Sequence, residues 1–177
     1  IGQLVSTNKI ANTLASNHRK CSVNTVESYL NALIESYIIY KISRYDIKGK
    51  EYLKTGDKYY VCDLGLRNYL LGSVKDLGSI LENIIFLELK RRNYDIYIGK
   101  YEDSEVDFVI KKNDGLKYIQ VSLSIRDEKT LERELTPLKE IHDNYPKYMI
   151  TLDYDSADYE GIRQINAIDL LMGRVDL

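Results

Sequence analysis

The sequence has little of the chemistry that stabilises secreted proteins. Its 177 residues include two cysteines, two prolines, two histidines and no tryptophan. Two cysteines are too few for a disulfide framework. No apolar run approaches the roughly 20 residues that cross a bilayer, so we expect no membrane partner. These absences predict a cytoplasmic protein with reduced thiols.

Several nucleotide-binding and catalytic motifs are also absent. The sequence contains neither a G-x-x-x-x-G-K-[ST] phosphate loop nor a G-x-G-x-x-G fingerprint. No Ser/His/Asp or Cys/His arrangement stands out. ATP would therefore bind outside these residues, and Mg²⁺ is the one cofactor that we consider for them. The first residue is Ile rather than Met, which suggests a piece of a longer chain.

The composition that remains is that of a globular protein, with 44% hydrophobic and 29% charged residues. The net charge of −2 is the sum of a basic part and an acidic part. Residues 1–63 carry 9 Lys+Arg and 6 Asp+Glu, a balance of +3, and residues 64–177 carry 16 and 21, a balance of −5. The shift predicts two domains, 1–63 and 64–177.

Helical periodicity in the basic part predicts two helices. Ser6 can cap a short first helix. Apolar residues at helical spacing over 26–37 predict a second helix. Asn24, with Glu27 three residues later, resembles a capping box, which places the start of that helix near Thr25.

A β-hairpin is expected after the second helix. Residues 38–42 and 58–61 are rich in β-branched and aromatic side chains, and Gly49 supplies a turn between them. Two helices and a hairpin with a basic tip are typical of a winged helix-turn-helix, whose second helix enters a major groove while the hairpin meets phosphates. The candidate nucleic-acid contacts are Asn24, Thr25, Ser28 and Asn31 on the helix, and Arg44, Lys48 and Lys50 on the hairpin.

An interaction role remains an alternative for this first part. Winged helices also bind other proteins, and Glu27 and Glu35 on the exposed face of the second helix would repel phosphates. The 16 tyrosines are interpreted as packing residues. A base-stacking platform would need several of them exposed together on one sheet face, which the sequence does not show.

The acidic part predicts an α/β domain with a central mixed sheet flanked by helices. Ser79 and Glu82 form a capping box that opens a helix ending near Arg92. Strand-like stretches, a second helix and a last strand follow at 94–98, 105–110, 117–123, 127–142 and 147–152. The expected order is therefore helix, three strands, helix, strand.

Polar side chains on the middle strands are the candidate site. Glu105 and Asp107 share one face of their strand, and Gln120 and Ser122 share one face of the next, because side chains alternate along a strand. If these faces adjoin, the four side chains converge with Glu82. Such oxygen donors suit Mg²⁺, with Glu105 and Asp107 as candidate ligands, and the ion could activate water for phosphodiester hydrolysis.

This pattern resembles the core of the PD-(D/E)XK, or restriction-endonuclease-like, superfamily. More closely, the whole chain is similar to the C-terminal half of a family of prokaryotic AAA-type ATPases. In that family a P-loop ATPase domain precedes a winged helix and a nuclease-like domain of the DUF4143 type. The segments that carry the resemblance lie at 24–33, 58–67, 81–83, 105–108 and 118–121.

The resemblance assigns catalytic positions to Glu82, Asp107 and Gln120. Glu82 matches the helix acid, Asp107 matches the first-strand metal ligand, and Gln120 stands where a second acid is usual. Ser122 stands at the position of the catalytic lysine, and a hydroxyl cannot supply the charge of an ammonium. The resemblance therefore implies a degenerate nuclease site. Glu82 as the capping acid, and Glu105 and Asp107 as a solvated edge, are the structural alternatives.

We expect a C-terminal recognition or interaction module of an AAA-type ATPase, without an activity of its own. Its expected partners are the upstream ATPase domain and, as candidate ligand, nucleic acid. One alternative is a Mg²⁺-dependent nuclease that uses Glu82, Glu105 and Asp107. Another is a protein–protein adaptor that binds no nucleic acid.

Overall fold

The computed structural model describes residues 4–19, 21–72, 76–113 and 115–177. The first elements along the chain are β1 (Leu4–Val5), α1 (Thr7–Ser16), α2 (Val23–Glu35), β2 (Ile39–Asp46), β3 (Glu51–Val61) and α3 (Leu64–Leu71). They are followed by α4 (Leu77–Arg91), β4 (Asp95–Tyr101), β5 (Ser104–Lys112), β6 (Gly115–Val121), α5 (Glu128–Lys139), β7 (Lys147–Thr151), β8 (Asp158–Tyr159), β9 (Ile162–Asn166) and α6 (Ala167–Leu171).

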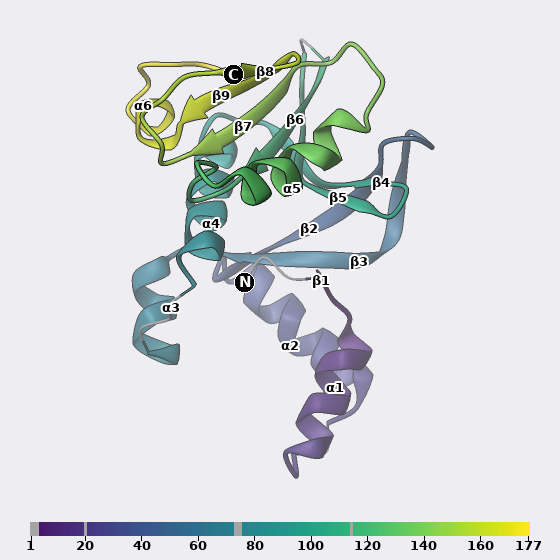
Figure 1. Cartoon of the computed structure of the whole chain (residues 1–177). Helices are drawn as coiled ribbons and strands as arrows, with labels where there is room; N and C mark the ends of the chain where they lie inside the picture. Colours follow the sequence, from purple (N-terminus) through teal and green to yellow (C-terminus); the bar gives the residue numbers. More distant parts are fainter. Residues whose placement is uncertain (1–3, 20, 73–75, 114) are drawn as a thin grey trace.

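The described strands form one mixed sheet in the order β1-β3-β2-β4-β5-β6-β7-β9-β8, flanked by helices (Figure 1). This confirms the predicted α/β class with a large mixed sheet. The sheet includes strands from both predicted domains. β2 pairs antiparallel with β3 and parallel with β4, where Arg44 lies opposite Ile98. The division of the chain at residue 63 stays a prediction.

Two connections in the first third differ from the expected boundaries because of local capping. The side chain of Ser22 accepts a hydrogen bond from the N–H of Thr25, so α2 begins at Val23, two residues before the predicted start. The segment after β3 forms a helix, α3, that was not predicted from the sequence. Asp63 accepts a hydrogen bond from the N–H of Leu66 and caps α3.

The start of α4 also differs, and this changes the interpretation of Glu82. Asp76 caps the helix by accepting a hydrogen bond from the N–H of Ser79, so α4 begins at Leu77. Glu82 is therefore not the capping acid and lies inside the helix. Its side chain is free of that role and points toward β3, where it accepts a hydrogen bond from Tyr60.

Apolar side chains cover both faces of the sheet. On one face, α4 and α6 pack on a cluster that includes Tyr60, Phe86 and Phe108, with the rings of Tyr60 and Phe86 stacked 4.3 Å apart. On the other face, α5 packs on a cluster that includes Val109 and Tyr118. The sheet is thus the middle layer of three.

Asn83, which is fully buried, attaches α4 to β3. Its Oδ1 accepts a hydrogen bond from the N–H of Val61 at 2.9 Å, and its Nδ2 donates to the carbonyl of Val61 at 3.0 Å. Asn83 therefore pairs both backbone groups of Val61, a residue of β3 that lies beyond the part of the strand paired with β1.

We predict that Asn83→Ala lowers the free energy of unfolding by about 1–3 kcal/mol, the typical consequence of leaving a buried polar group unpaired. Urea unfolding followed by circular dichroism measures the change. Asn12→Ala, on the exposed part of α1, is the matched control. Equal urea midpoints for the two variants would contradict this role of Asn83.

Candidate functional site

A lysine from β3 lies among the acids that the sequence singles out. The Nζ of Lys58 is 2.6 Å from Oε1 of Glu105 and 3.4 Å from Oε1 of Glu82. The hydroxyl of Tyr60 donates to that same Glu82 oxygen at 2.6 Å. Lys58 is only 3% exposed, so its charge is withdrawn from water and requires these partners.

The alternation of β3 explains why Lys58 and Tyr60 reach the same acid. The two residues are two positions apart, so both side chains leave the same face of the strand, toward α4. Sequence reasoning did not select Lys58. The available signal was weak, because Lys58 opens the aromatic and β-branched stretch 58–61 but β3 also carries Glu51, Lys54 and Asp57. A lysine that becomes buried is almost always paired, but the sequence does not show which lysine is buried.

Asp107 lies at an irregularity in β5. Tyr97 of β4 pairs with Val109, whereas Gly99 pairs with Val106, so two steps along β4 match three along β5. Such a bulge alters the direction of the side chains around it. Oδ2 of Asp107 accepts a hydrogen bond from the N–H of Val121 at 2.9 Å, just beyond the last β5–β6 ladder pair, Phe108 with Ile119.

Gln120 joins this group only in part. Its Oε1 accepts a hydrogen bond from the N–H of Asp107 at 3.2 Å, while its Nε2 donates to Glu134 on α5 at 3.1 Å. Ser122 donates to the carbonyl of Ser124. The predicted convergence therefore holds for Glu82, Glu105 and Asp107 around Lys58, and Gln120 turns to the opposite helix. The catalytic roles assigned to Glu82, Asp107 and Gln120 stay predictions.

The charges of the cluster act on one another. Burial, together with the nearby Glu82, raises the pKa of Asp107 to about 8, although Lys58 and the Val121 amide oppose this rise. Burial lowers the pKa of Lys58, but Glu82, Asp107 and Glu105 outweigh it and the net shift is upward. The site therefore favours a charged ammonium beside three carboxyl groups.

The arrangement does not fit a resident Mg²⁺ ion. Among the residues that the structure describes, no group of three or more His, Cys, Asp or Glu side chains is arranged to hold a metal. Glu82 and Glu105 contact the ammonium of Lys58. Asp107 Oδ2 and Gln120 Oε1 accept backbone hydrogen bonds. One side-chain oxygen of each of these four residues thus already has a partner.

The seven candidate nucleic-acid contacts do not form one surface. Helix α2, with Asn24, Thr25, Ser28 and Asn31, lies below the sheet in Figure 1, whereas the β2–β3 turn lies at the right, far from it. Lys48 of this turn forms an ion pair with Glu102 at 2.6 Å. Lys50 is exposed, and Arg44 lies half-buried within β2. Their nucleic-acid role stays a prediction.

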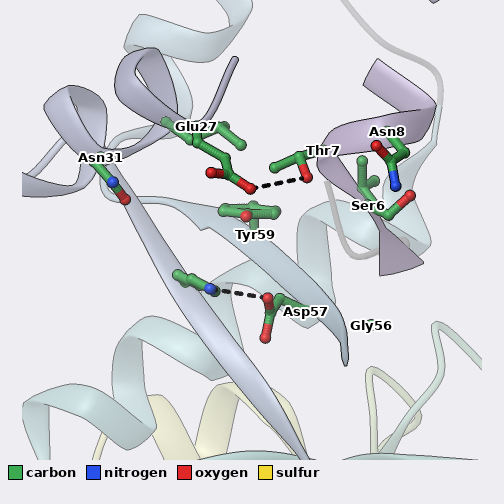
Figure 2. Close-up of a pocket in the computed structure, with 11 residues that line it drawn as sticks. Ser6, Thr7, Asn8, Glu27, Asn31, Gly56, Asp57 and Tyr59 are labelled. Atoms are coloured by element: carbon green, nitrogen blue, oxygen red, sulfur yellow. Dashed lines mark hydrogen bonds and ion pairs between the residues drawn. The ribbon is translucent and has the colours of Figure 1, made fainter. Parts of the chain in front are cut away.

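Asn31 and Glu27 of α2 instead face a pocket between this helix, the start of α1 and the hairpin (Figure 2). The pocket has a volume of about 410 Å³. Glu27 accepts a hydrogen bond from Thr7, and Lys41 forms an ion pair with Asp57 at 3.0 Å. Glu27 on this helix face thus contacts α1, while Asn24, Ser28 and Asn31 stay exposed.

Two proteins described as uncharacterized are similar to nearly the whole chain. It is 40% identical over 174 residues to an uncharacterized protein of Haemophilus influenzae, covering 97% of this chain and 43% of that protein. It is 31% identical over 169 residues to an uncharacterized protein of Methanocaldococcus jannaschii, covering 93% of this chain and 37% of that protein. The chain therefore spans less than half the length of these relatives.

A family described as a domain of unknown function, DUF8612, matches residues 1–76, which end at the cap of α4. No solved structure matched the chain. Within the described residues, no helix is long and apolar enough to cross a membrane.

We predict that Asp107→Asn changes the pH dependence of stability. The folded protein keeps Asp107 protonated up to about pH 8, whereas an unfolded chain releases this proton near pH 3.9. Folding therefore takes up a proton between these values, and wild-type stability falls as the pH rises. Urea unfolding at a series of pH values should show the variant gaining stability relative to wild type from pH 4 to pH 8. A difference that is the same at every pH would refute the raised pKa.

Proposed function

We propose that this chain is the nucleic-acid recognition and interaction module of a prokaryotic AAA-type ATPase, and that its nuclease-like centre does not cleave. The observation that carries this proposal is the pairing of buried Lys58 with Glu82 and Glu105. A recognition module can retain a nuclease-like fold while a cation from its own chain neutralises the former metal site.

The order of elements supports the nuclease-like part of the proposal. Helix α4 is followed by β4, β5 and β6, which pair antiparallel, then by α5 and by β7, which pairs parallel with β6. This is the helix, three strands, helix, strand order of the resemblance. Asp107 and Gln120 lie on the two middle strands of it. The α1–α2 pair and the β2–β3 hairpin likewise support a winged helix.

The length of the relatives and an apolar surface support a link to a larger protein. The two relatives are more than twice as long as the matched region. Between α2 and α3 lies an apolar pocket of about 230 Å³, bordered by the exposed Leu33, Leu66 and Leu70. Apolar groups exposed together mark surfaces that bind another protein or domain. The ATPase domain is the occupant that we propose for this surface.

The charge state of the acid cluster explains the expected lack of cleavage. Catalysis by the nuclease-like pattern needs carboxylates that are free to hold a metal ion, and an ammonium free to act on the reacting phosphate. Here neither group is free, because the ammonium of Lys58 contacts the carboxylates of Glu82 and Glu105 directly.

We predict that the protein binds DNA but leaves it intact. Fluorescence anisotropy with labelled duplex and single-stranded DNA should show binding that weakens as salt rises, since phosphate contacts release counterions. Supercoiled plasmid incubated with Mg²⁺ or Mn²⁺ should stay uncut. Binding without a salt slope, or no binding at low salt, would refute nucleic-acid recognition. Cleavage that Asp107→Ala abolishes would refute the inactive centre.

A Mg²⁺-dependent nuclease is the second candidate, and Lys58 is the specific observation that favours it. The sequence pattern has Ser122 where a catalytic lysine is usual, and the structure brings an ammonium to the acids from a different strand. Under this second candidate, the contacts of Lys58 with the acids would have to open before a metal ion enters.

Replacing Lys58 separates the two candidates. If the lysine neutralises the acids, Lys58→Met destabilises the protein by about 3–5 kcal/mol, the typical result of removing one partner of a buried ion pair. Added Mg²⁺ should then raise the melting temperature of this variant and not that of wild type. Lys41→Met, which removes the exposed ion pair with Asp57, is the matched control. An equal Mg²⁺ effect on wild type would contradict neutralisation by Lys58, and wild-type cleavage lost in Lys58→Met would establish the nuclease.

A further inference from the structure

Three tyrosines form a row on the face of the sheet that α5 covers elsewhere. Tyr52 of β3 lies opposite Tyr45 of β2, and Tyr45 lies opposite Gly99 of β4, two residues after Tyr97. The ring centroids of Tyr52 and Tyr97 are 4.9 Å apart, and those of Tyr45 and Tyr52 are 5.5 Å apart. Residues far apart in the sequence thus form a tyrosine platform, in which Tyr45 is buried and Tyr52 is exposed.

This platform borders a small pocket. Tyr45, Tyr52 and Tyr97 line it together with Lys111 of β5, Leu116 of β6 and Tyr145, which precedes β7. Its volume is about 190 Å³, below the roughly 300 Å³ at which pockets for drug-sized ligands begin. Tyr52 is 55% exposed and Tyr145 is 41% exposed, so two rings are open to a ligand. The pocket therefore suits a single planar ring.

The charge at the pocket distinguishes between the ligands that aromatic rings attract. Tyrosine cages bind quaternary ammonium groups, but the exposed ammonium of Lys111 at the rim would repel such a cation. Lys48 and Lys50 lie in the turn that joins the strands of Tyr45 and Tyr52. The acids nearby are Asp95, opposite Lys111 in the ladder, and Glu102, which pairs with Lys48. Asp46 and Glu51 lie opposite each other at the end of the β2–β3 ladder, and Asp143 accepts a hydrogen bond from the N–H of Tyr145. Among the described residues that line the pocket itself, Lys111 is the charged one, so an aromatic ring that carries an anionic chain fits the pocket better than a cation.

We propose that the pocket binds an unpaired base of a single-stranded nucleic acid, stacked against Tyr52 and Tyr145, while Lys111 and Lys50 contact the neighbouring phosphates. Bases stack on exposed aromatic side chains of a sheet regardless of sequence, and lysines that follow the backbone add salt-dependent affinity. This inference rests on the nucleic-acid part of the proposed function and adds its ligand class, an unpaired strand. It is independent of the acid centre, which lies on the opposite face of the sheet.

The test is binding of oligothymidine of about 15 nucleotides, within the range that one small fold occupies. Fluorescence anisotropy compares wild type with Tyr52→Leu and Tyr52→Phe, with Tyr154→Leu as control because Tyr154 is 86% exposed and lies outside the pocket. We expect Tyr52→Leu to weaken the Kd by roughly 5- to 100-fold, the range for losing one stacked base. Tyr52→Phe and Tyr154→Leu should bind like wild type.

Two further arms identify the ligand and its position. Oligouridine in place of oligothymidine distinguishes an RNA from a DNA ligand, and a duplex of equal length should compete poorly with either strand. A central 5-iodouracil, irradiated on the wild-type protein, should crosslink to peptides that contain Tyr52 or Tyr145. This arm does not depend on how any variant folds.

Several results would overturn the proposal. Wild-type affinity in Tyr52→Leu, crosslinks only outside the pocket, or a duplex that competes equally well would each refute base stacking here while leaving nucleic-acid recognition in place. No binding of wild type to single strands and to duplex would refute both proposals together.

Discussion

The ion pairs of Lys58 are the interaction on which the centre of this structure depends. They join β3, α4 and β5, and the pairing of β2 with β4 places the two strands in one sheet. A lysine buried to this degree needs charged partners. Glu82 and Glu105 therefore hold the Lys58 ammonium in place, and the ammonium in turn holds their carboxylates. Asn83 adds a neutral link between the same helix and strand.

The continuous sheet presents different chemistry on its two faces. On the α4 face, carboxyl groups surround one ammonium, and the raised pKa of Asp107 records first its burial and then the repulsion from Glu82. On the α5 face, tyrosines from β2, β3 and β4 meet beside Lys111. A nucleic-acid strand would find its stacking surface on the second face, so recognition does not require the acids to be catalytically competent.

The sequence predicted the features that depend on local periodicity. Helices α1, α2, α4 and α5, the hairpin, and the helix, three strands, helix, strand order follow from residues close together in the chain. Helices α3 and α6 and strands β8 and β9 were not predicted. Three features depend on tertiary pairing and could not be predicted this way. Lys58 contacts Glu105, 47 positions later, Gln120 of β6 donates to Glu134 of α5, and the tyrosine row needs the parallel pairing of β2 with β4.

The most direct test of the central claim is the titration of Lys58 itself. NMR of protein labelled at lysine Cε, with Lys58→Arg to assign the signal, follows its protonation with pH. We predict that Lys58 keeps its charge beyond the ordinary lysine value of 10.5, because the three carboxyl groups outweigh burial. Loss of the proton near neutral pH would show that burial prevails and that the acids do not hold an ammonium, which would contradict neutralisation of the site by Lys58.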